Sequence, residues 1–176
     1  MQVAIEIVGD VSYFKVKVKL GKLEISNQYI DKLEIANALK ISINELSDKP
    51  VKNVSTSRFK RIIELKDLVT LNELIPNYDY LEEICDKIES TGLYQFVKGE
   101  NNIYHARQFP NNTGYLEDSA TGVAASALEV YVRDVMNQSF DELKVYQGSA
   151  MNSPSKIIVM NDNESNSVVG NANFID

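Results

Sequence analysis

Apolar and polar residues alternate along several short stretches of the chain, and this pattern predicts strands. The clearest case is residues 14–20, in which apolar residues alternate with Lys15, Lys17 and Lys19. Alternation with a period of two is typical of a strand with one face toward solvent. Apolar runs bounded by turn residues predict further strands at 23–25, 51–55, 59–65, 94–97, 103–109, 143–147, 155–160 and 168–174, with a hairpin turn at 161–166.

Segments with a helical spacing of apolar residues interrupt these strands. The pattern predicts helices at 31–40, 67–74, 78–91 and 120–136, with a short turn at 42–46. Ser42 and Glu45 have the spacing of a capping box, and Gly92 is expected just past the end of the third helix. Strands and helices do not follow strict β-α-β order, which favours an α+β fold with a mixed sheet.

The predicted helix 120–136 is the most informative of these elements. Its first half carries small or apolar side chains on every face, and its only charges are Glu129, Arg133 and Asp134. A helix that is apolar all round is buried all round. With about seventeen residues it would be about 25 Å long, close to the width of a small domain. We therefore expect a central helix wrapped by the sheet.

Composition and charge narrow the class of protein. The chain has 176 residues, 44% hydrophobic and 24% charged, which suits one domain with a real core. A net charge of −7 disfavours nucleic acid as a partner. Cys85 and one histidine are too few ligands for a structural zinc site, and a single cysteine cannot form an internal disulfide. There is no basic leader followed by an apolar run and no apolar stretch of membrane-spanning length, so we expect a cytoplasmic protein with no membrane partner.

The segment leading into the helix 120–136 is the candidate for chemistry. Residues 117–122 read Glu-Asp-Ser-Ala-Thr-Gly and place polar groups beside the unpaired N–H groups of a helix N-terminus. Such a terminus carries about half a positive charge and can hold a carboxylate. The residues alone leave two interpretations open. Either Asp118 or Ser119 is an ordinary N-cap of a core helix, or the terminus is a ligand site.

Several motifs resemble one known family. Arg107–Pro110, Gly114–Gly122 and Gln147–Ser155 look like the second half of the phenazine-biosynthesis PhzF-like isomerases, and Val54–Thr56 resembles a strand of that family. The resemblance implies one half of a diaminopimelate-epimerase-like fold, in which two halves face each other across a cleft. We therefore expect an α+β fold with a mixed, largely antiparallel sheet curled around a long buried central helix. Residues 1–176 would be a single domain corresponding to the C-terminal half.

Three departures from the family pattern bear on activity. Ser119 stands where the family usually has Pro, and Val123 stands where it usually has Ser. The catalytic Glu and the Gly-His helix start of the family's first half do not occur in this chain. The single His105 falls on a predicted strand and is expected to be a strand-face residue.

The chemistry implied by the resemblance is proton removal and redelivery on a small amino- or hydroxy-acid-like substrate, without a cofactor or metal. Asp118 would position the substrate or shuttle a proton. The backbone N–H groups of Thr121, Gly122 and Val123 would hold the acid group of this small carboxylate-bearing ligand. Ser119 stands near the place where related racemases carry a cysteine, and Cys85 is expected to be a core residue instead.

Three hypotheses follow for the chain as a whole. The first is a PhzF-like isomerase or epimerase that needs a partner, either a separate N-terminal half or a second copy in a homodimer. The second is a non-catalytic ligand-binding or assembly module that keeps the fold without the chemistry. The third is that the chain is a fragment of a longer reading frame.

Overall fold

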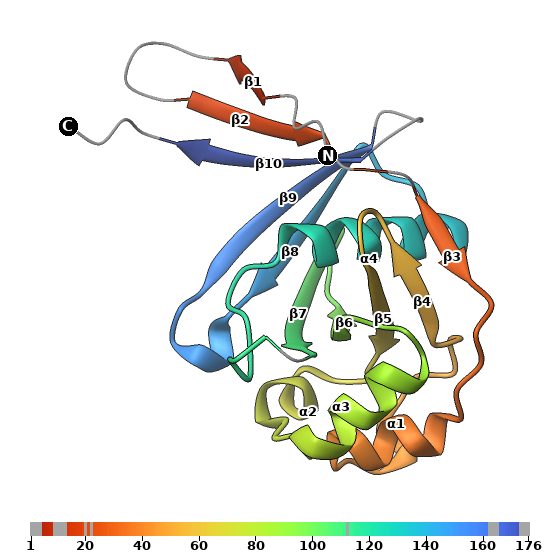
Figure 1. Ribbon diagram of the computed structural model, residues 1–176. Helices are drawn as coiled ribbons and strands as arrows, with labels where there is room; N and C mark the ends of the chain where they lie inside the picture. Colours follow the sequence, from red (N-terminus) through yellow and green to blue (C-terminus); the bar gives the residue numbers. More distant parts are fainter. Residues whose placement is uncertain are drawn as a thin grey trace.

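One mixed sheet runs through the part of the chain that the computed structural model describes, residues 5–8, 14–19, 21, 23–111, 113–161 and 166–172. Its ten strands lie in the order β1-β2-β10-β9-β8-β7-β6-β5-β4-β3 (Figure 1). The pairs β5–β6 and β7–β8 are parallel, and the other neighbouring pairs are antiparallel. The strands are β1 (Ile5–Val8), β2 (Phe14–Lys19), β3 (Glu24–Ser26), β4 (Lys52–Ser55), β5 (Phe59–Glu64), β6 (Gly92–Lys98), β7 (Ile103–Pro110), β8 (Glu142–Gln147), β9 (Ser155–Asn161) and β10 (Asn166–Ala172). The predicted mixed, largely antiparallel sheet is confirmed.

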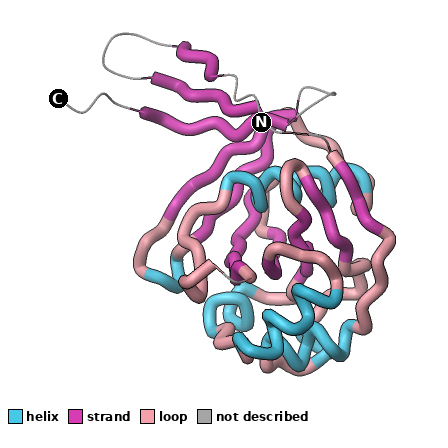
Figure 2. The backbone as a smooth tube through the Cα atoms, viewed as in Figure 1, coloured by secondary structure: helices cyan, strands magenta, loops and turns pink. Residues whose placement is uncertain are grey.

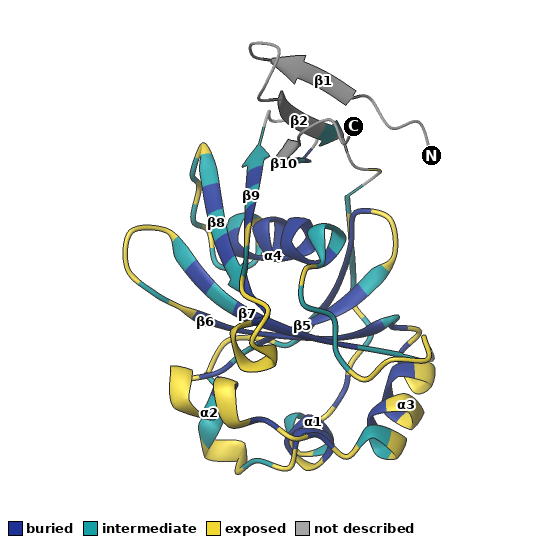
Figure 3. Cartoon of the chain, turned by 90° about the vertical axis from the view of Figure 1, so that its left-hand side faces the viewer, coloured by how far each residue is buried: buried dark blue, intermediate teal, exposed yellow. Residues whose placement is uncertain are grey.

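Helix α4 lies inside the curl of the sheet, as the sequence predicts (Figure 3). It spans Gly122–Asp134, and every residue from Ala124 to Val132 is buried. Small side chains in its first half let strands approach from several sides. The opposite face of the sheet is covered by the helices α1 (Lys32–Leu39), α2 (Leu68–Glu73) and α3 (Tyr78–Lys87), with 3₁₀ turns at η1 (Ile43–Glu45) and η2 (Ser149–Met151) (Figure 2).

The two faces of the sheet carry separate apolar clusters. Ile62 and Tyr94 belong to the cluster around α4, whereas Ile63 and Leu93 belong to the cluster under α1–α3. Successive side chains of a strand point to opposite faces, so central strands with both faces covered read as continuous apolar runs. We call these faces the α4 face and the α1–α3 face.

The end of the third predicted helix differs from the structure. α3 ends at Lys87, and Glu89, with φ 51°, takes the left-handed position beyond it. The Ser90 N–H donates to the carbonyl of Cys85, which closes the helix end without glycine. Gly92 instead begins β6 with φ 147°, and a Cβ there would lie 2.4 Å from Gln108 Nε2. A contact between strands, rather than a helix end, requires this glycine.

Other local predictions have mixed outcomes. The capping box is present: the Ser42 hydroxyl accepts from the backbone of Asn44, and the Ser42 N–H donates to the Glu45 carboxylate at 2.7 Å, although the element is a 3₁₀ turn. The segments 162–165 and 173–174, predicted as turn and strand, lie outside the described residues, as do the side chains of the alternating lysines of β2. Within the described part of the chain, no helix has the length and apolar character needed to cross a membrane.

Candidate functional site

The segment that leads into α4 is fixed to strand β7. The Asp118 N–H donates to the carbonyl of Gln108 at 3.1 Å, forming an isolated antiparallel bridge. Next to it, Glu117 makes a two-point ion pair with Arg107, with N–O distances of 2.7 and 2.8 Å. Arg107 also donates to the carbonyl groups of Leu71, Asn72 and Leu74 around the end of α2. Because such paired, largely buried contacts hold their geometry well, Asp118 has a defined position.

Gln147 at the end of β8 holds the same segment from the other side. Its Nε2 donates to the carbonyl of Asp118 at 2.7 Å and to the Thr121 hydroxyl at 3.1 Å. Its Oε1 accepts from the Tyr94 hydroxyl at 3.0 Å and from the Thr121 N–H at 3.4 Å. Burial, with the charge of Asp118, raises the pKa of Tyr94, so the phenol stays protonated as the donor. This fully buried amide therefore joins three elements at the start of α4.

Ser119 is held by the strands that follow. The Ser155 hydroxyl donates to the carbonyl of Ser119 at 2.8 Å. Gly148 adopts φ 80°, and a Cβ there would lie 2.2 Å from the Ser153 carbonyl oxygen and 2.8 Å from that of Ser119. The backbone of residues 118–121 is thus packed against the turn after β8 without room for a side chain.

The N-cap prediction is wrong for both candidate residues. Thr121 occupies the N-cap position of α4 and makes no side-chain capping bond. The Asp118 carboxylate instead accepts from the Thr121 hydroxyl at 2.6 Å and from the Ala120 N–H at 3.3 Å. The helix starts two residues later than predicted because Gln147 holds the preceding backbone in a non-helical path. As a result, no side chain caps the first turn of α4 within the described residues.

Gly122 and Val123 are placed at this first turn. A Cβ at Gly122 would lie 3.3 Å from a methyl group of Val168 in β10, so this glycine lets the helix approach the strand closely. The carbonyl of Val123 accepts a long, 3.4 Å hydrogen bond from the hydroxyl of Thr56, which is fully buried after β4. The structure therefore places Asp118 and residues 119–123 around the start of α4. The Thr121 N–H, however, donates to Gln147, so of the three backbone donors predicted to hold the acid only those of Gly122 and Val123 lack a side-chain acceptor among the described residues.

Lys60, which was not predicted from the sequence as a site residue, lies on the α4 face because it pairs with Val54 of the α4 cluster. Its Nζ donates to the carbonyl of Thr91 at 3.0 Å. Burial lowers the pKa of Lys60 from its usual 10.5 to about 8; the charge of Arg58 lowers it further, while Cys85 and Asp118 act in the opposite direction. The signal was present in the sequence, since a lysine two residues before the buried Ile62 must share its face.

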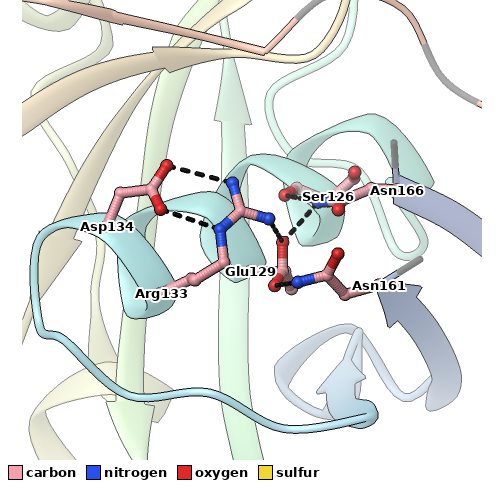
Figure 4. A network of polar contacts seen from close by, with 6 residues as sticks. All are labelled: Ser126, Glu129, Arg133, Asp134, Asn161 and Asn166. Atoms are coloured by element: carbon pink, nitrogen blue, oxygen red, sulfur yellow. Dashed lines mark hydrogen bonds and ion pairs between the residues drawn. The ribbon is translucent and has the colours of Figure 1, made fainter. Parts of the chain in front are cut away.

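A second polar centre holds the middle of α4 (Figure 4). The Glu129 carboxylate accepts from Asn166 and, at 3.2 Å, from Asn161, and it pairs with Arg133 at 3.3 Å. Arg133 also forms two bonds to Asp134 (Figure 4). Burial raises the pKa of Glu129, while its hydrogen bonds and the charge of Arg133 act in the opposite direction. These charges are satisfied by protein groups and tie α4 to β9 and β10.

Cys85 and His105 lie in surroundings typical of residues with a structural role. Cys85 is fully buried in the α1–α3 cluster, and burial raises the pKa of its thiol to about 12. His105 lies on β7, as predicted for a strand-face residue, and stacks on Tyr146 with ring centroids 5.8 Å apart. Among the described residues, no three His, Cys, Asp or Glu side chains are grouped as a metal site would require.

Comparison with known sequences gives a consistent result. The profile of a family described as phenazine biosynthesis-like protein matches residues 3–175. An uncharacterized isomerase from Clostridium acetobutylicum is 31% identical over 158 residues, covering 84% of this chain and 52% of that protein. The uncharacterized isomerase YfhB from Bacillus subtilis is 24% identical over 139 residues, covering 75% of this chain and 47% of its own length. The chain spans about half the length of these curated relatives.

Solved structures share the fold. A predicted epimerase from Pseudomonas aeruginosa superposes with a TM-score of 0.80 at 24% identity, covering 99% of this chain and 63% of that one. A PhzF-family phenazine biosynthesis protein from Bacillus anthracis gives a TM-score of 0.77 at 18% identity, covering 99% and 64%. The predicted fold, a sheet curled around a central helix as in one half of these proteins, is confirmed.

Proposed function

Because the chain belongs to the phenazine biosynthesis-like protein family, we propose that it supplies one half of an isomerase site, corresponding to the C-terminal half of the family's fold. This half binds a small carboxylic acid at the N-terminal end of α4. The reaction is cofactor-independent removal and return of a proton next to the acid group. Asp118 positions the substrate or shuttles the proton, and Ser119, Thr121, Gly122 and Val123 contact the acid.

The observation that carries this proposal is the uncapped first turn of α4. Capping is the usual fate of a helix N-terminus, yet the donors at Gly122 and Val123 receive no side-chain acceptor among the described residues. The nearest carboxylate, Asp118, is turned to the Thr121 hydroxyl instead. Backbone N–H groups with the positive end of a buried helix favour an anion, and a carboxylate supplies it.

The same arrangement suits proton transfer. Abstracting a proton beside a carboxylate requires stabilisation of the charge that develops on the acid group. Hydrogen-bond donors that are already in position stabilise this charge without a cost of reorganisation. Contacts with Gln147, Gly148 and Ser155 fix the backbone of residues 118–121 just before the donors of α4. The base on the opposite side of the substrate would come from the partner.

The partner in this proposal is a separately encoded first half or a second copy of the chain. The support is the coverage: the chain accounts for 52% of the Clostridium acetobutylicum relative. The family's catalytic Glu belongs to the half that this chain lacks. A homodimer would bring two α4 termini together but no such Glu, so the first-half partner is the one expected to support turnover.

A second candidate function is ligand binding without catalysis. Val123 favours it, because an apolar, half-buried side chain stands where the family usually has a hydroxyl. This candidate shares the acid site with the first and differs only in proton transfer. Exchange of the substrate C–H with solvent deuterium therefore separates them: the isomerase assembly exchanges it, and a binding module does not.

The acid site itself can be tested on the labelled chain by NMR titration with lactate. We expect saturable shifts of the backbone amides of Gly122, Val123 and Ala124, because these donors face the bound carboxylate. Asp141→Asn, at an exposed carboxylate beyond the C-terminal end of α4, is a matched control and should leave the titration unchanged. The proposal fails if these three amides shift no more than surface amides do.

A further inference from the structure

The side chains of Lys60, Gln108 and Asp118 lie on the α4 face beside the proposed acid site. Gln108 pairs with Tyr94 across β6–β7, and on its other side it bridges to Asp118. Residues directly opposite on paired strands place their side chains on the same face. Since Tyr94 belongs to the α4 cluster, Gln108 and Asp118 share the α4 face with it.

The side-chain amide of Gln108 is almost completely buried. Its side chain is 1% exposed, and neither Nε2 nor Oε1 has a hydrogen-bond partner among the described residues. It leans over Gly92, where a Cβ would lie only 2.4 Å from Nε2. Burying an amide without a partner is costly, and native proteins rarely do so without a reason. The glycine therefore makes room for the Gln108 amide itself, whose hydrogen-bonding atoms the described residues do not satisfy.

Lys60 approaches the same place from β5. It lies on the α4 face opposite Val54 and is 8% exposed. Its hydrogen-bond acceptor is the carbonyl of Thr91, the residue before Gly92. The ammonium and the Gln108 amide thus flank one glycine. An ammonium can donate several hydrogen bonds. Among the described residues, Lys60 Nζ makes one bond to a neutral carbonyl and has no counter-ion in contact, which leaves a buried charge poorly compensated.

We propose that Lys60 and Gln108 form a second anion subsite beside Asp118, so that the acid bound at α4 is a small dicarboxylate. This inference rests on the proposed function. One carboxylate faces the first turn of α4, and the other accepts from Lys60 Nζ and Gln108 Nε2. A carboxylate is the fitting occupant, because both groups are donors and one of them is charged. Asp118, between the two ends, then lies beside the carbon chain of the ligand.

Electrostatics on this face agree with such an occupant. Burial lowers the pKa of Lys60 to about 8 because the ammonium loses hydration; Arg58 lowers the pKa further, and Cys85 and Asp118 partly offset both effects. A bound anion would offset it further. Succinate binding should therefore raise the pKa of Lys60, an effect that a purely structural lysine would not show.

The test is calorimetric titration of the protein, in the assembly in which it purifies, with succinate and with butyrate. These probes have the same chain length and differ in one carboxylate. We expect succinate to bind about tenfold more tightly, as one charge-assisted contact would give. Gln108→Leu and Lys60→Met should abolish this preference by weakening succinate binding about tenfold. Gln108→Glu keeps the side-chain size and should weaken succinate binding by repulsion.

Gln95 provides the matched control. It is fully buried, and both of its amide atoms also lack partners among the described residues. It pairs with Ile63 and Arg107 and so lies on the α1–α3 face. Gln95→Leu should keep the preference for succinate.

The outcomes separate this inference from the proposed function. Equal binding of succinate and butyrate by the unmodified protein, or a preference that survives in Gln108→Leu, overturns the dicarboxylate subsite. In either case butyrate binding at the amides of Gly122 and Val123 would leave the acid site of α4 intact. Failure of both probes to bind would overturn the acid site, and the subsite with it.

Discussion

The two faces of the sheet bury similar polar side chains in different surroundings. β5 places Lys60 on the α4 face and Arg61 on the α1–α3 face. Each face also buries a glutamine, Gln108 or Gln95, whose side-chain amide has no hydrogen-bond partner in the part of the chain that the structure describes. On the α1–α3 face, an apolar cluster under three helices surrounds these groups, and Gln95 lies opposite Arg107, whose charge is paired with Glu117. On the α4 face they lie beside a carboxylate and an uncapped helix terminus.

Arg61 carries a buried positive charge on the α1–α3 face. One of its nitrogen atoms donates to the carbonyl of Gln28 at 3.2 Å, and Nε and the other terminal nitrogen have no partner among the described residues. Burial lowers the pKa of Arg61 to about 10. The comparison teaches that an unpartnered buried polar group does not by itself mark a site. What distinguishes Lys60 and Gln108 is their position beside Asp118 and α4.

The largest expected effect of a substitution is on catalysis at the α4 face. In an assembly with the missing half, Asp118→Asn should slow solvent-deuterium exchange into the bound acid by about 10²–10⁴-fold, the usual contribution of a positioned proton-transfer group. Asp141→Asn, which changes the same charge at an exposed position, should match the unmodified protein. An Asp118→Asn assembly with unchanged exchange would remove the catalytic distinction between the two faces.

The next effect concerns the packing that shapes the α4 face. Gly148→Ala should lower the free energy of unfolding by about 3 kcal/mol or more, because the new Cβ meets two carbonyl oxygens and φ is positive there. Gly170→Ala, where a Cβ would meet nothing within 4 Å, is the control and should change stability little. Urea unfolding measures both. Similar losses for the two variants would show that the turn after β8 is not held as described.

Lys60→Met tests the buried charge through pH. Because the pKa of Lys60 falls from 10.5 to about 8 on folding, the unfolded chain binds more protons between these values. The contribution of Lys60 to stability should therefore rise as pH increases from about 8 to 10.5, and its penalty is fully present below pH 8. Lys60→Met should remove this rise and gain up to about 3 kcal/mol at pH 7. Unfolding curves at pH 7 and 9.5 check it; an unchanged slope would contradict the burial of the ammonium.

A smaller effect is expected at Glu129, the charge on α4 that protein groups do satisfy. Its pKa is raised, so its contribution to stability is present below the usual carboxyl range and is lost as pH rises through the folded-state pKa. Glu129→Gln should flatten this decline, which begins as pH rises above about 4.5, in thermal unfolding. It should leave lactate binding at Gly122 unchanged, since its network lies further along the helix. A loss of binding would show that the two ends of α4 act together.

Local patterns predicted the elements, and long-range contacts decided the site. The period of the apolar residues placed the central helix to within two residues of the observed α4, because its composition requires burial on all sides. The prediction for Gly92 was wrong because a local helix-end rule competed with the approach of Gln108 from another strand. The inward direction of Gln108 depends on the register with Asp118, which no local pattern encodes. The role of Gln147 likewise depends on a loop that returns beside β8.

The comparison between the two faces can be tested in one NMR titration with succinate. The protein is labelled so that the Gly122 backbone amide and the side-chain amides of Gln108 and Gln95 are all observed. The account predicts that Gly122 and Gln108 shift together with a common saturation point, while Gln95 stays in place. Equal responses of the two glutamines, or a response of neither Gly122 nor Gln108, would contradict a ligand site on the α4 face.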